Sequence, residues 1–283
     1  MRWFKATGWR HLYGIALLTV AIFPVLFILS ASLNPTGTVS DTNNLFSNIS
    51  LDNYRDLFND PQNPFLDWFI NTQVLAVGTA VITVFLGAMA AYAFSRYRFR
   101  GRDAGLTGLL LVQMFPQLLA YIALFLLLAA IGQVFPVLGL GSRLGLMLVY
   151  LGGALGVNTW LLKGFFDTVP RDLDESAYID GASHAQIFFR IMLPLVTPIL
   201  VVVGLLSYVF TIGELVLARV LLGDDVEKQT LAVGLFGFIS EQFSQNWGVF
   251  AAGAILGALP LVILFQFLQR YIVGGLLAGS VKG

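Results

Sequence analysis

The chain alternates between long apolar runs and polar connections, and the runs have the length of membrane-spanning helices. A helix needs about 20 apolar residues to cross a hydrocarbon core roughly 30 Å thick. Six runs meet this length, near residues 12–33, 69–94, 105–130, 144–162, 193–218 and 248–271. The pattern therefore predicts an all-α, multi-pass integral membrane protein with six transmembrane helices.

The first run has features of a signal peptide as well as of a membrane span. Arg2, Lys5 and Arg10 precede it, and Ser30-Ala31-Ser32 resembles a cleavage site. Its apolar stretch is longer than the roughly 7–15 residues of a signal peptide's hydrophobic region. We therefore interpret the run as an uncleaved transmembrane helix.

Composition agrees with a membrane protein and removes several other classes. Hydrophobic residues make up 57% of the chain and charged residues 11%, whereas soluble domains carry roughly 25% charged residues. Because the chain has no cysteine, disulfides and Cys-ligated metal centres are excluded. A formal net charge of zero gives no reason to expect a nucleic-acid partner.

The distribution of basic residues predicts the orientation of the spans. With the N-terminus inside, twelve Lys and Arg residues fall in inner segments and four in outer segments. Because positively charged loops stay on the cytoplasmic side, both termini are expected in the cytoplasm. The run RYRFRGR, residues 96–102, carries much of this bias, and we interpret it as a topology anchor rather than a ligand site.

The chain lacks the short motifs of ATP-binding and hydrolytic enzymes. Gly is never followed by Lys, so no G-x-x-x-x-G-K-[ST] phosphate loop is present, and neither H-E-x-x-H nor G-x-S-x-G occurs. We therefore expect neither an enzyme nor a metal or cofactor site in this chain.

Few polar side chains lie within the predicted spans. Glu214 is the one carboxylate, and its place near the outer end of a span, with Arg219 close by, favours contact with water over a functional role. The amides are expected to form hydrogen bonds between helices. These amides are Asn71, Gln73, Gln113, Gln117, Asn158 and Gln266.

The polar segment DESAYIDGASHAQIFFRIMLP, residues 174–194, separates two apolar runs. Asp172, Asp174 and Glu175 follow Pro170 and form the acidic first turn that a helix N-terminus favours. Asp172 and Glu175 also have the spacing of a capping box. The segment therefore predicts a short capped helix between the fourth and fifth spans.

The rest of this segment predicts a second helix and a bend. Tyr178, Ala182, Ala185 and Phe189 recur on one helical face. Gly181 weakens a helix by about 1 kcal/mol relative to Ala. It therefore indicates a bend between two short helices or the close approach of another backbone. Pro194 and Pro198 suit the first turn of the following span.

The spacing of this segment resembles the EAA motif of ABC importer permeases, E-A-A-x₃-G-x₉-I-x-L-P. Every position agrees except Ser176, which stands where the motif has Ala. The resemblance implies the type I ABC importer fold and a coupling segment that seats in a cleft of the nucleotide-binding subunit, where Glu175 pairs with a basic residue. The implied coupling residues are Glu175, Ser176, Ala177, Asp180, Gly181, Ile191, Leu193 and Pro194.

Further stretches are similar to the maltose/maltodextrin permeases of this family, namely TLAVGLFGF, NWGVFAAG, LGALPLVILF and LLAGSVKG. The resemblance implies a first helix and periplasmic segment over 1–66, a permease domain over 67–271, and a Gly-rich cytoplasmic tail over 272–283 that reaches between the ATPase subunits. It also implies a MalF-like second permease subunit, a homodimeric MalK-like ATPase that binds the ATP, and a periplasmic or lipid-anchored sugar-binding protein. Because direct sugar contacts lie mainly on the second permease subunit, no sugar-binding residue is assigned here.

The favoured hypothesis is an inner-membrane permease that imports maltodextrin-like oligosaccharides by alternating access. One alternative is a permease for another sugar or for glycerol phosphate. Another is a secondary carrier that works without ATP, although the spans lack the chain of ionisable groups that such a carrier uses.

The outer loop between the last two spans contains a short apolar stretch, Thr230 to Ile239, which is too short to cross a bilayer. It suits a helix that lies along the membrane surface or re-enters it. The polar tip that follows is expected, from the resemblance, to enter the binding protein's sugar cleft. The tip residues are Glu241, Gln242, Phe243, Ser244, Gln245 and Asn246, followed by Trp247, which also suits an interfacial anchor.

Overall fold

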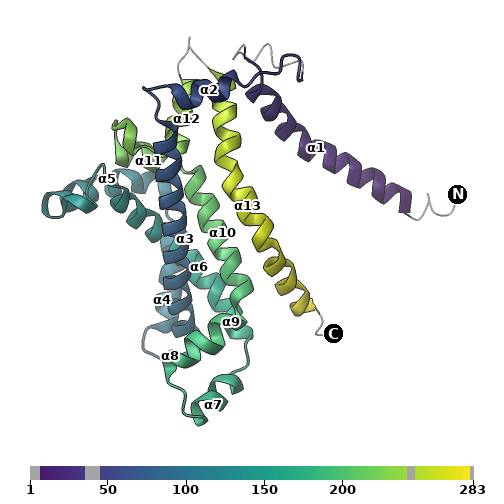
Figure 1. The fold of residues 1–283 in the computed structure, drawn as a ribbon. Helices are drawn as coiled ribbons and strands as arrows, with labels where there is room; N and C mark the ends of the chain where they lie inside the picture. Colours follow the sequence, from purple (N-terminus) through teal and green to yellow (C-terminus); the bar gives the residue numbers. More distant parts are fainter. Residues whose placement is uncertain (1–6, 36–44, 241–245, 281–283) are drawn as a thin grey trace. The chain divides into compact units, whose positions relative to one another are not determined.

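The computed structural model describes residues 7–35, 45–240 and 246–280, and within these ranges it is helical without any strand. Figure 1 shows the helices in chain order. Five helices in the described ranges are long and apolar enough to cross a membrane, or six if one bent pair counts as a single span. The predicted fold class is confirmed.

The chain divides into two compact units, residues 1–66 with 234–260, and residues 67–233 with 261–283. In the first unit, helix α1 (Trp9–Ser32) is followed by the short helix α2 (Asp52–Asn59). The buried amide of Asn53 donates hydrogen bonds of 3.0 and 2.8 Å to the carbonyls of Ser32 and Asn34. These bonds hold α2 against the end of α1.

Most of the predicted spans appear as uninterrupted helices. Helix α1 corresponds to the first predicted run, α3 (Phe65–Arg96) to the second, α6 (Arg143–Thr168) to the fourth and α13 (Trp247–Ser280) to the sixth. Helix α6 begins where the Ser142 hydroxyl accepts a 3.3 Å hydrogen bond from the Gly145 amide, as an N-cap residue does.

The prediction of one helix over residues 105–130 is wrong. The structure has α4 (Arg102–Gln113) and α5 (Gln117–Val134), with a break between them. Pro116 stands at this break. Proline has no amide proton to donate and disfavours helical backbone at the residue before it, so it separates the two helices.

The prediction of one helix over residues 193–218 is also wrong, because the chain bends twice. Helix α8 (His184–Gln186), the π-helix η4 (Ile187–Met192) and α9 (Leu193–Leu195) run together and meet α10 (Thr197–Gly213) at an angle of 78°. As predicted, Pro198 lies in the first turn of α10.

The second break follows Glu214, after which α11 (Val216–Leu222) begins. The Glu214 carboxylate accepts hydrogen bonds of 2.7 and 2.9 Å from the amides of Leu217 and Ala218. A carboxylate that satisfies these free amides stabilises the start of a new helix. The break therefore has a local cause in the Glu214 side chain.

Three short helices complete the connections: η3 (Pro136–Leu138), η5 (Val226–Lys228) and α12 (Leu231–Ser240). Helix α12 contains ten residues and corresponds to the predicted short apolar stretch. The stretch is therefore helical, and ten residues are too few to cross a bilayer, as predicted.

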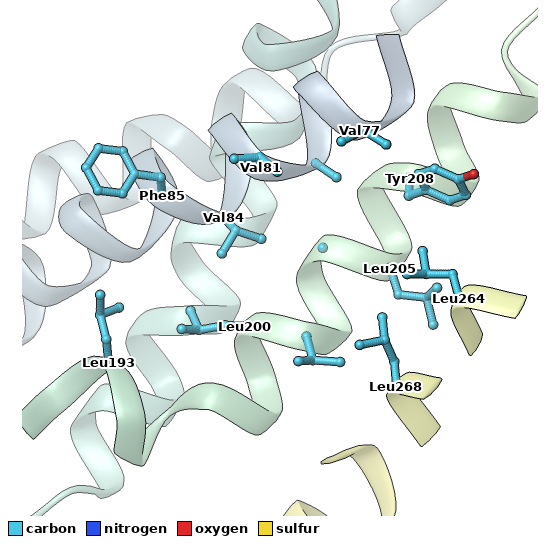
Figure 2. Close-up of a pocket in the computed structure, with 13 residues that line it drawn as sticks. Val77, Val81, Val84, Phe85, Leu193, Leu200, Leu205, Tyr208, Leu264 and Leu268 are labelled. Atoms are coloured by element: carbon cyan, nitrogen blue, oxygen red, sulfur yellow. The ribbon is translucent and has the colours of Figure 1, made fainter. Parts of the chain in front are cut away.

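A cavity of 430 Å³ lies within the second unit between α3, α10 and the part of α13 that belongs to that unit. Figure 2 shows Val81 and Val84 of α3 lining it opposite Leu200 and Leu205 of α10. The Tyr208 hydroxyl at its edge donates a 2.5 Å hydrogen bond to Gln73. Because its lining is almost entirely apolar, this cavity does not suit the many hydroxyl groups of a sugar.

Candidate coupling site

The EAA segment begins with helix α7 (Asp172–Ile179), whose first turn contains Asp172, Asp174 and Glu175 as predicted. The predicted capping box at Asp172 is wrong, because Asp172 lies inside the first turn and no side chain caps the helix start. The capping box lies further on. The Ser183 hydroxyl accepts from the Gln186 amide at 3.3 Å, and the Gln186 side chain accepts from the Ser183 amide at 2.7 Å.

Gly181 forms the predicted bend after α7. Its φ of 85° lies in the left-handed region that glycine adopts without strain. The Gly181 amide donates to the Tyr178 carbonyl at 3.1 Å and the Ala182 amide to the Ala177 carbonyl at 3.0 Å, which is the Schellman pattern of a helix end. Apart from its chain neighbours, none of the residues that the structure describes lies within 4 Å of a Cβ built here, so the alternative of a close backbone approach is wrong for the described part of the chain.

The bend separates residues that the sequence placed on one helical face. Tyr178 lies in the last turn of α7 and Phe189 lies in η4, so the predicted common face of Tyr178, Ala182, Ala185 and Phe189 is wrong. Instead, the ring of His184 lies 5.4 Å from Tyr178 and 5.8 Å from Tyr97, measured between centroids. The histidine thus connects α7 to the chain just after α3.

A buried ion pair attaches α7 to the end of α3. Arg96 Nε lies 2.5 Å from Asp174 Oδ2, and the two side chains are only 7% and 17% exposed. The contact does not meet hydrogen-bond geometry, so its attraction is electrostatic. Arg96 also donates a 2.9 Å hydrogen bond to the Val169 carbonyl, just before α7. Sequence reasoning missed this role of Arg96, which it treated only as part of a topology anchor.

Ser95 supports the same junction. Its hydroxyl donates a 2.7 Å hydrogen bond to Asp167 of α6, whose other carboxylate oxygen lies 2.5 Å from Lys163. Arg171, directly before α7, donates to the Ser95 carbonyl at 3.3 Å. The end of α3 therefore contacts the chain on both sides of the turn between α6 and α7.

The predicted coupling residues divide between an outward and an inward face. Glu175, Ser176, Asp180 and Gly181 are exposed, whereas Ala177 is half-buried against the core. Further along, Ile191 and Leu193 are half-buried and Pro194 is exposed. Glu175 and Ser176 are thus available to another subunit, whereas Ala177 packs within this chain.

Apolar side chains accompany the acidic ones on the outward face of α7. Ile179 is 86% exposed, Tyr178 60% and Leu173 43%. These three side chains are therefore available for contact with another surface. The sequence motif does not include Ile179, so only the structure identifies this side chain as part of the outward face of α7.

The segment after the bend is fixed in the core of the second unit. Ile187, Phe188 and Met192 of η4 are buried and pack with Tyr92 of α3 and Phe166 of α6. Figure 1 shows α7 and α8 together at the end of α3 opposite α11. Motion of α7 can therefore reach α3 and α6 through closely packed side chains as well as through the chain itself.

The predicted loop residues 241–245 lie outside the described residues, whereas Asn246 lies within them. The Asn246 side chain accepts a 3.1 Å hydrogen bond from the Val249 amide and so caps α13. Trp247 contacts Phe250 edge to face, with centroids 5.9 Å apart. Of the predicted tail over 272–283, residues 272–280 belong to α13 and residues 281–283 lie outside the described part.

The predicted hydrogen bonds between helices are present for some of the amide side chains within the spans. Interhelical hydrogen bonds are confirmed for Gln73, for Gln113, which donates to the Gly153 carbonyl at 2.8 Å, and for Asn158, which donates to Ser207 at 3.3 Å. Gln117 instead lines a second, mainly apolar cavity of 670 Å³ between α4, α5 and α6.

Glu214 and Asn71 have roles that the sequence did not predict. Glu214 accepts from the Tyr150 hydroxyl as well as from the α11 amides, and in the described ranges it forms no ion pair with Arg219. Asn71 donates to the carbonyls of Glu227 and Gln229, in addition to the predicted hydrogen bond between helices, which its oxygen accepts from Arg143 of α6. Nothing in the local sequence of either residue indicates these partners.

Comparisons with known proteins identify the family to which this chain belongs. The family model described as "Binding-protein-dependent transport system inner membrane component" matches residues 83–277. The maltodextrin transport permease MdxG of Bacillus subtilis is 40% identical, covering 96% of this chain and 95% of that protein. The galactooligosaccharides transport permease GanQ of the same organism is 38% identical, covering 97% and 96%. The maltose/maltodextrin transport permease MalG of Vibrio vulnificus is 40% identical, covering 96% and 95%.

A solved structure of a bacterial ABC transporter involved in the import of the acidic polysaccharide alginate superposes with a TM-score of 0.75 at 25% identity, covering 96% of this chain and 98% of that one. A second structure of an alginate ABC transporter, with a TM-score of 0.64 and 17% identity, shares the fold. Because the family model and the relatives cover most of its length, this chain belongs to the binding-protein-dependent transport system inner membrane components, the permease subunits of ABC importers.

Proposed function

We propose that this chain is one half of a heterodimeric permease that moves maltodextrin-like oligosaccharides into the cell by alternating access. A sequence identity of 40% to relatives named for maltodextrin and maltose/maltodextrin transport supports this substrate class. A relative named for galactooligosaccharides is nearly as similar, at 38%. Galactose-containing oligosaccharides are therefore the second candidate substrate.

The observation that carries the coupling role is the outward face of α7. Ile179, 86% exposed, stands beside Tyr178 and follows the exposed carboxylate of Glu175. Such a face fits a groove with an apolar floor and a basic rim on an ATPase subunit, because burial of the apolar groups and pairing of the carboxylate then occur together. Closure of the ATPase dimer would carry α7 with it.

The proposal includes the sides of the membrane and the partners. The excess of Lys and Arg in the predicted inner segments supports a cytoplasmic location for both termini and for α7. ATP is bound and hydrolysed by a separate homodimeric ATPase, and a second permease subunit completes the path. A sugar-binding protein delivers substrate on the opposite side, where residues 241–246 contact it.

The proposed function is tested by reconstituting this chain into proteoliposomes with the second permease, the ATPase and the binding protein. Uptake of labelled maltodextrins should require ATP and binding protein, and should exceed uptake of galactooligosaccharides of equal length. The Glu175→Lys variant should assemble yet lose uptake, because it reverses the charge that faces the basic rim. Uptake that continues without ATP would instead identify a secondary carrier.

Contact between α7 and the ATPase has a direct test because the natural chain contains no cysteine. A single cysteine at position 179 should crosslink to the ATPase subunit, and one at Val81, exposed on α3, should not. Absence of the first crosslink from a complex that transports sugar would contradict the docking of α7.

A further inference from the structure

A cluster of buried side chains near the N-terminal end of α3 holds the loop that leads into α12. Trp68 Nε1 donates to the Val226 carbonyl at 2.7 Å, and the Leu231 amide donates to the Thr72 hydroxyl at 2.7 Å. Trp68 and Thr72 are 1% and 0% exposed. Side-chain hydrogen bonds thus fix both ends of the loop segment 226–231 to α3.

Asn71 fixes the middle of the same segment. Its amide donates to the carbonyls of Glu227 and Gln229 at 2.7 and 3.0 Å. Its oxygen accepts a hydrogen bond from Arg143 at the start of α6. Because Asn71 is 2% exposed, each of these bonds is shielded from water, and losing one leaves a buried polar group unsatisfied.

The C-terminal end of α3 holds α7 in a comparable way. Arg96 pairs with Asp174 and donates to the Val169 carbonyl, while Ser95 bonds to Asp167. At its C-terminal end, helix α3 therefore contacts α7, which is proposed to meet the ATPase. At its N-terminal end it contacts residues 226–231. These residues precede the loop that is proposed to meet the binding protein. Figure 1 shows α7 and α11 near these opposite ends.

Between these ends α3 is a single helix with no proline and no break. At 1.5 Å per residue, Asn71 and Arg96 are roughly 38 Å apart along it. It packs closely on α6, since a Cβ added to Gly87 would lie 3.2 Å from Leu162. A continuous helix supported along its length transmits a displacement with little bending.

We infer that α3 acts as a strut that couples the α7 segment to the 226–231 segment, with Arg96 and Asn71 as positioning residues at its two ends. The inference rests on the proposed function, because it links the ATPase-facing and binding-protein-facing parts of the same transporter. It deepens that function by stating how the docking of a sugar-loaded binding protein on one side of the membrane changes the ATPase on the other side. Coupling between two binding sites is reciprocal. Closure of the ATPase should therefore also strengthen the binding of the sugar-binding protein on the side of the permease where residues 226–231 lie.

The test measures the stimulation ratio, which is ATP hydrolysis with sugar-loaded binding protein divided by hydrolysis without it. Thr72→Val removes one bond at the N-terminal end, and Asp174→Asn removes the charge at the other end. Each should lower the ratio by at least about fivefold, the lower limit of a typical coupling between sites. The control Val81→Ala alters an exposed residue on the same helix and should leave the ratio unchanged.

A double-mutant cycle separates a shared strut from two local defects. If both ends act through α3, the double variant Thr72→Val/Asp174→Asn should be no worse than the more damaging single variant. Effects that multiply independently, or single variants with a wild-type ratio, would overturn the strut. Failure of the wild-type complex to transport sugar would instead contradict the proposed function.

A charge exchange covers the case in which Asp174→Asn does not assemble. The variant Arg96→Asp/Asp174→Arg restores an ion pair at the same place with reversed polarity. Recovery of assembly together with the stimulation ratio supports the strut. Recovery of assembly with a ratio at least about fivefold below wild type overturns it, because the pair would then serve stability alone.

Discussion

The hydroxyl of Tyr150 on α6 donates a 2.7 Å hydrogen bond to Oε2 of Glu214, at the break between α10 and α11. The same carboxylate accepts from the amides of Leu217 and Ala218. One side chain therefore ends α10, starts α11 and attaches both to α6. This arrangement stabilises a helix break within a segment whose apolar composition alone favours a continuous helix.

Replacing Glu214 should destabilise the isolated permease. Glu214→Ala leaves two helix-end amides and the Tyr150 hydroxyl without their acceptor, at a cost of about 1–3 kcal/mol for each buried group left unsatisfied. Thermal unfolding in detergent should show a lower midpoint, with a smaller decrease for Glu214→Gln, which keeps one oxygen. Arg219→Gln is the control, since Arg219 is exposed. Equal stability of Glu214→Ala and the wild type would mean that water replaces the carboxylate.

The connection between α5 and α6 depends on two glycines in close contact. A Cβ added to Gly139 would lie 2.6 Å from the Cα of Gly132. Gly139→Ala should therefore destabilise the permease by about 1–3 kcal/mol, as overpacking does. At Gly164 of α6, an added Cβ would have none of the described residues within 4 Å apart from its neighbours in the helix, so Gly164→Ala should instead stabilise the permease by about 0.5–1 kcal/mol. The same unfolding measurement compares the two, and opposite shifts are expected.

Conformation rather than space should determine which residues replace Gly181. At a φ of 85°, Ala costs about 1–2 kcal/mol, whereas Asn is better tolerated. Gly181→Ala and Gly181→Val should both reduce ATP-driven uptake, and Gly181→Asn should retain most of it. The three variants are compared in proteoliposomes at equal amounts of assembled complex. A ranking by side-chain size, with Ala harmless, would show that a partner's surface sets the limit.

Shortening the loop should separate substrate delivery from assembly. Deletion of residues 241–245 keeps Asn246, whose side chain caps α13. Sugar uptake should fall by about tenfold or more, equivalent to at least ~1.4 kcal/mol of lost interaction, while the ATPase still copurifies. A photoreactive probe at Gln242 should crosslink to the binding protein when ATP traps the closed ATPase dimer. Wild-type uptake without that crosslink would reduce the loop to a connection between helices.

Removal of residues 277–283 tests the tail. If the tail reaches between the ATPase subunits, the truncated complex should assemble less well or show a lower stimulation ratio. Chain ends are commonly frayed and dispensable, and unchanged hydrolysis in the truncated complex would favour that explanation. The comparison requires equal amounts of complex, quantified by size-exclusion chromatography.

Some properties of this protein follow from its sequence because they depend on residues close together in the chain. The length of apolar runs predicts helices long enough to cross a bilayer, and Gly181 predicts the bend that follows α7. Pro116 stands at the break within residues 105–130, whereas Pro24 and Pro260 lie inside the continuous helices α1 and α13. Proline disfavours a helix interior, but its presence in the sequence does not by itself locate a break.

Other properties were decided only by the tertiary structure. The pairing of Arg96 with Asp174, and the bonds from Asn71 to the carbonyls of Glu227 and Gln229, join residues far apart in the chain. An Arg in a basic run and an Asn in an apolar helix have many possible partners, and local pattern does not distinguish among them. Packing brings one partner within reach and excludes water, and the cost of leaving a buried polar group unpaired then makes that partner obligatory.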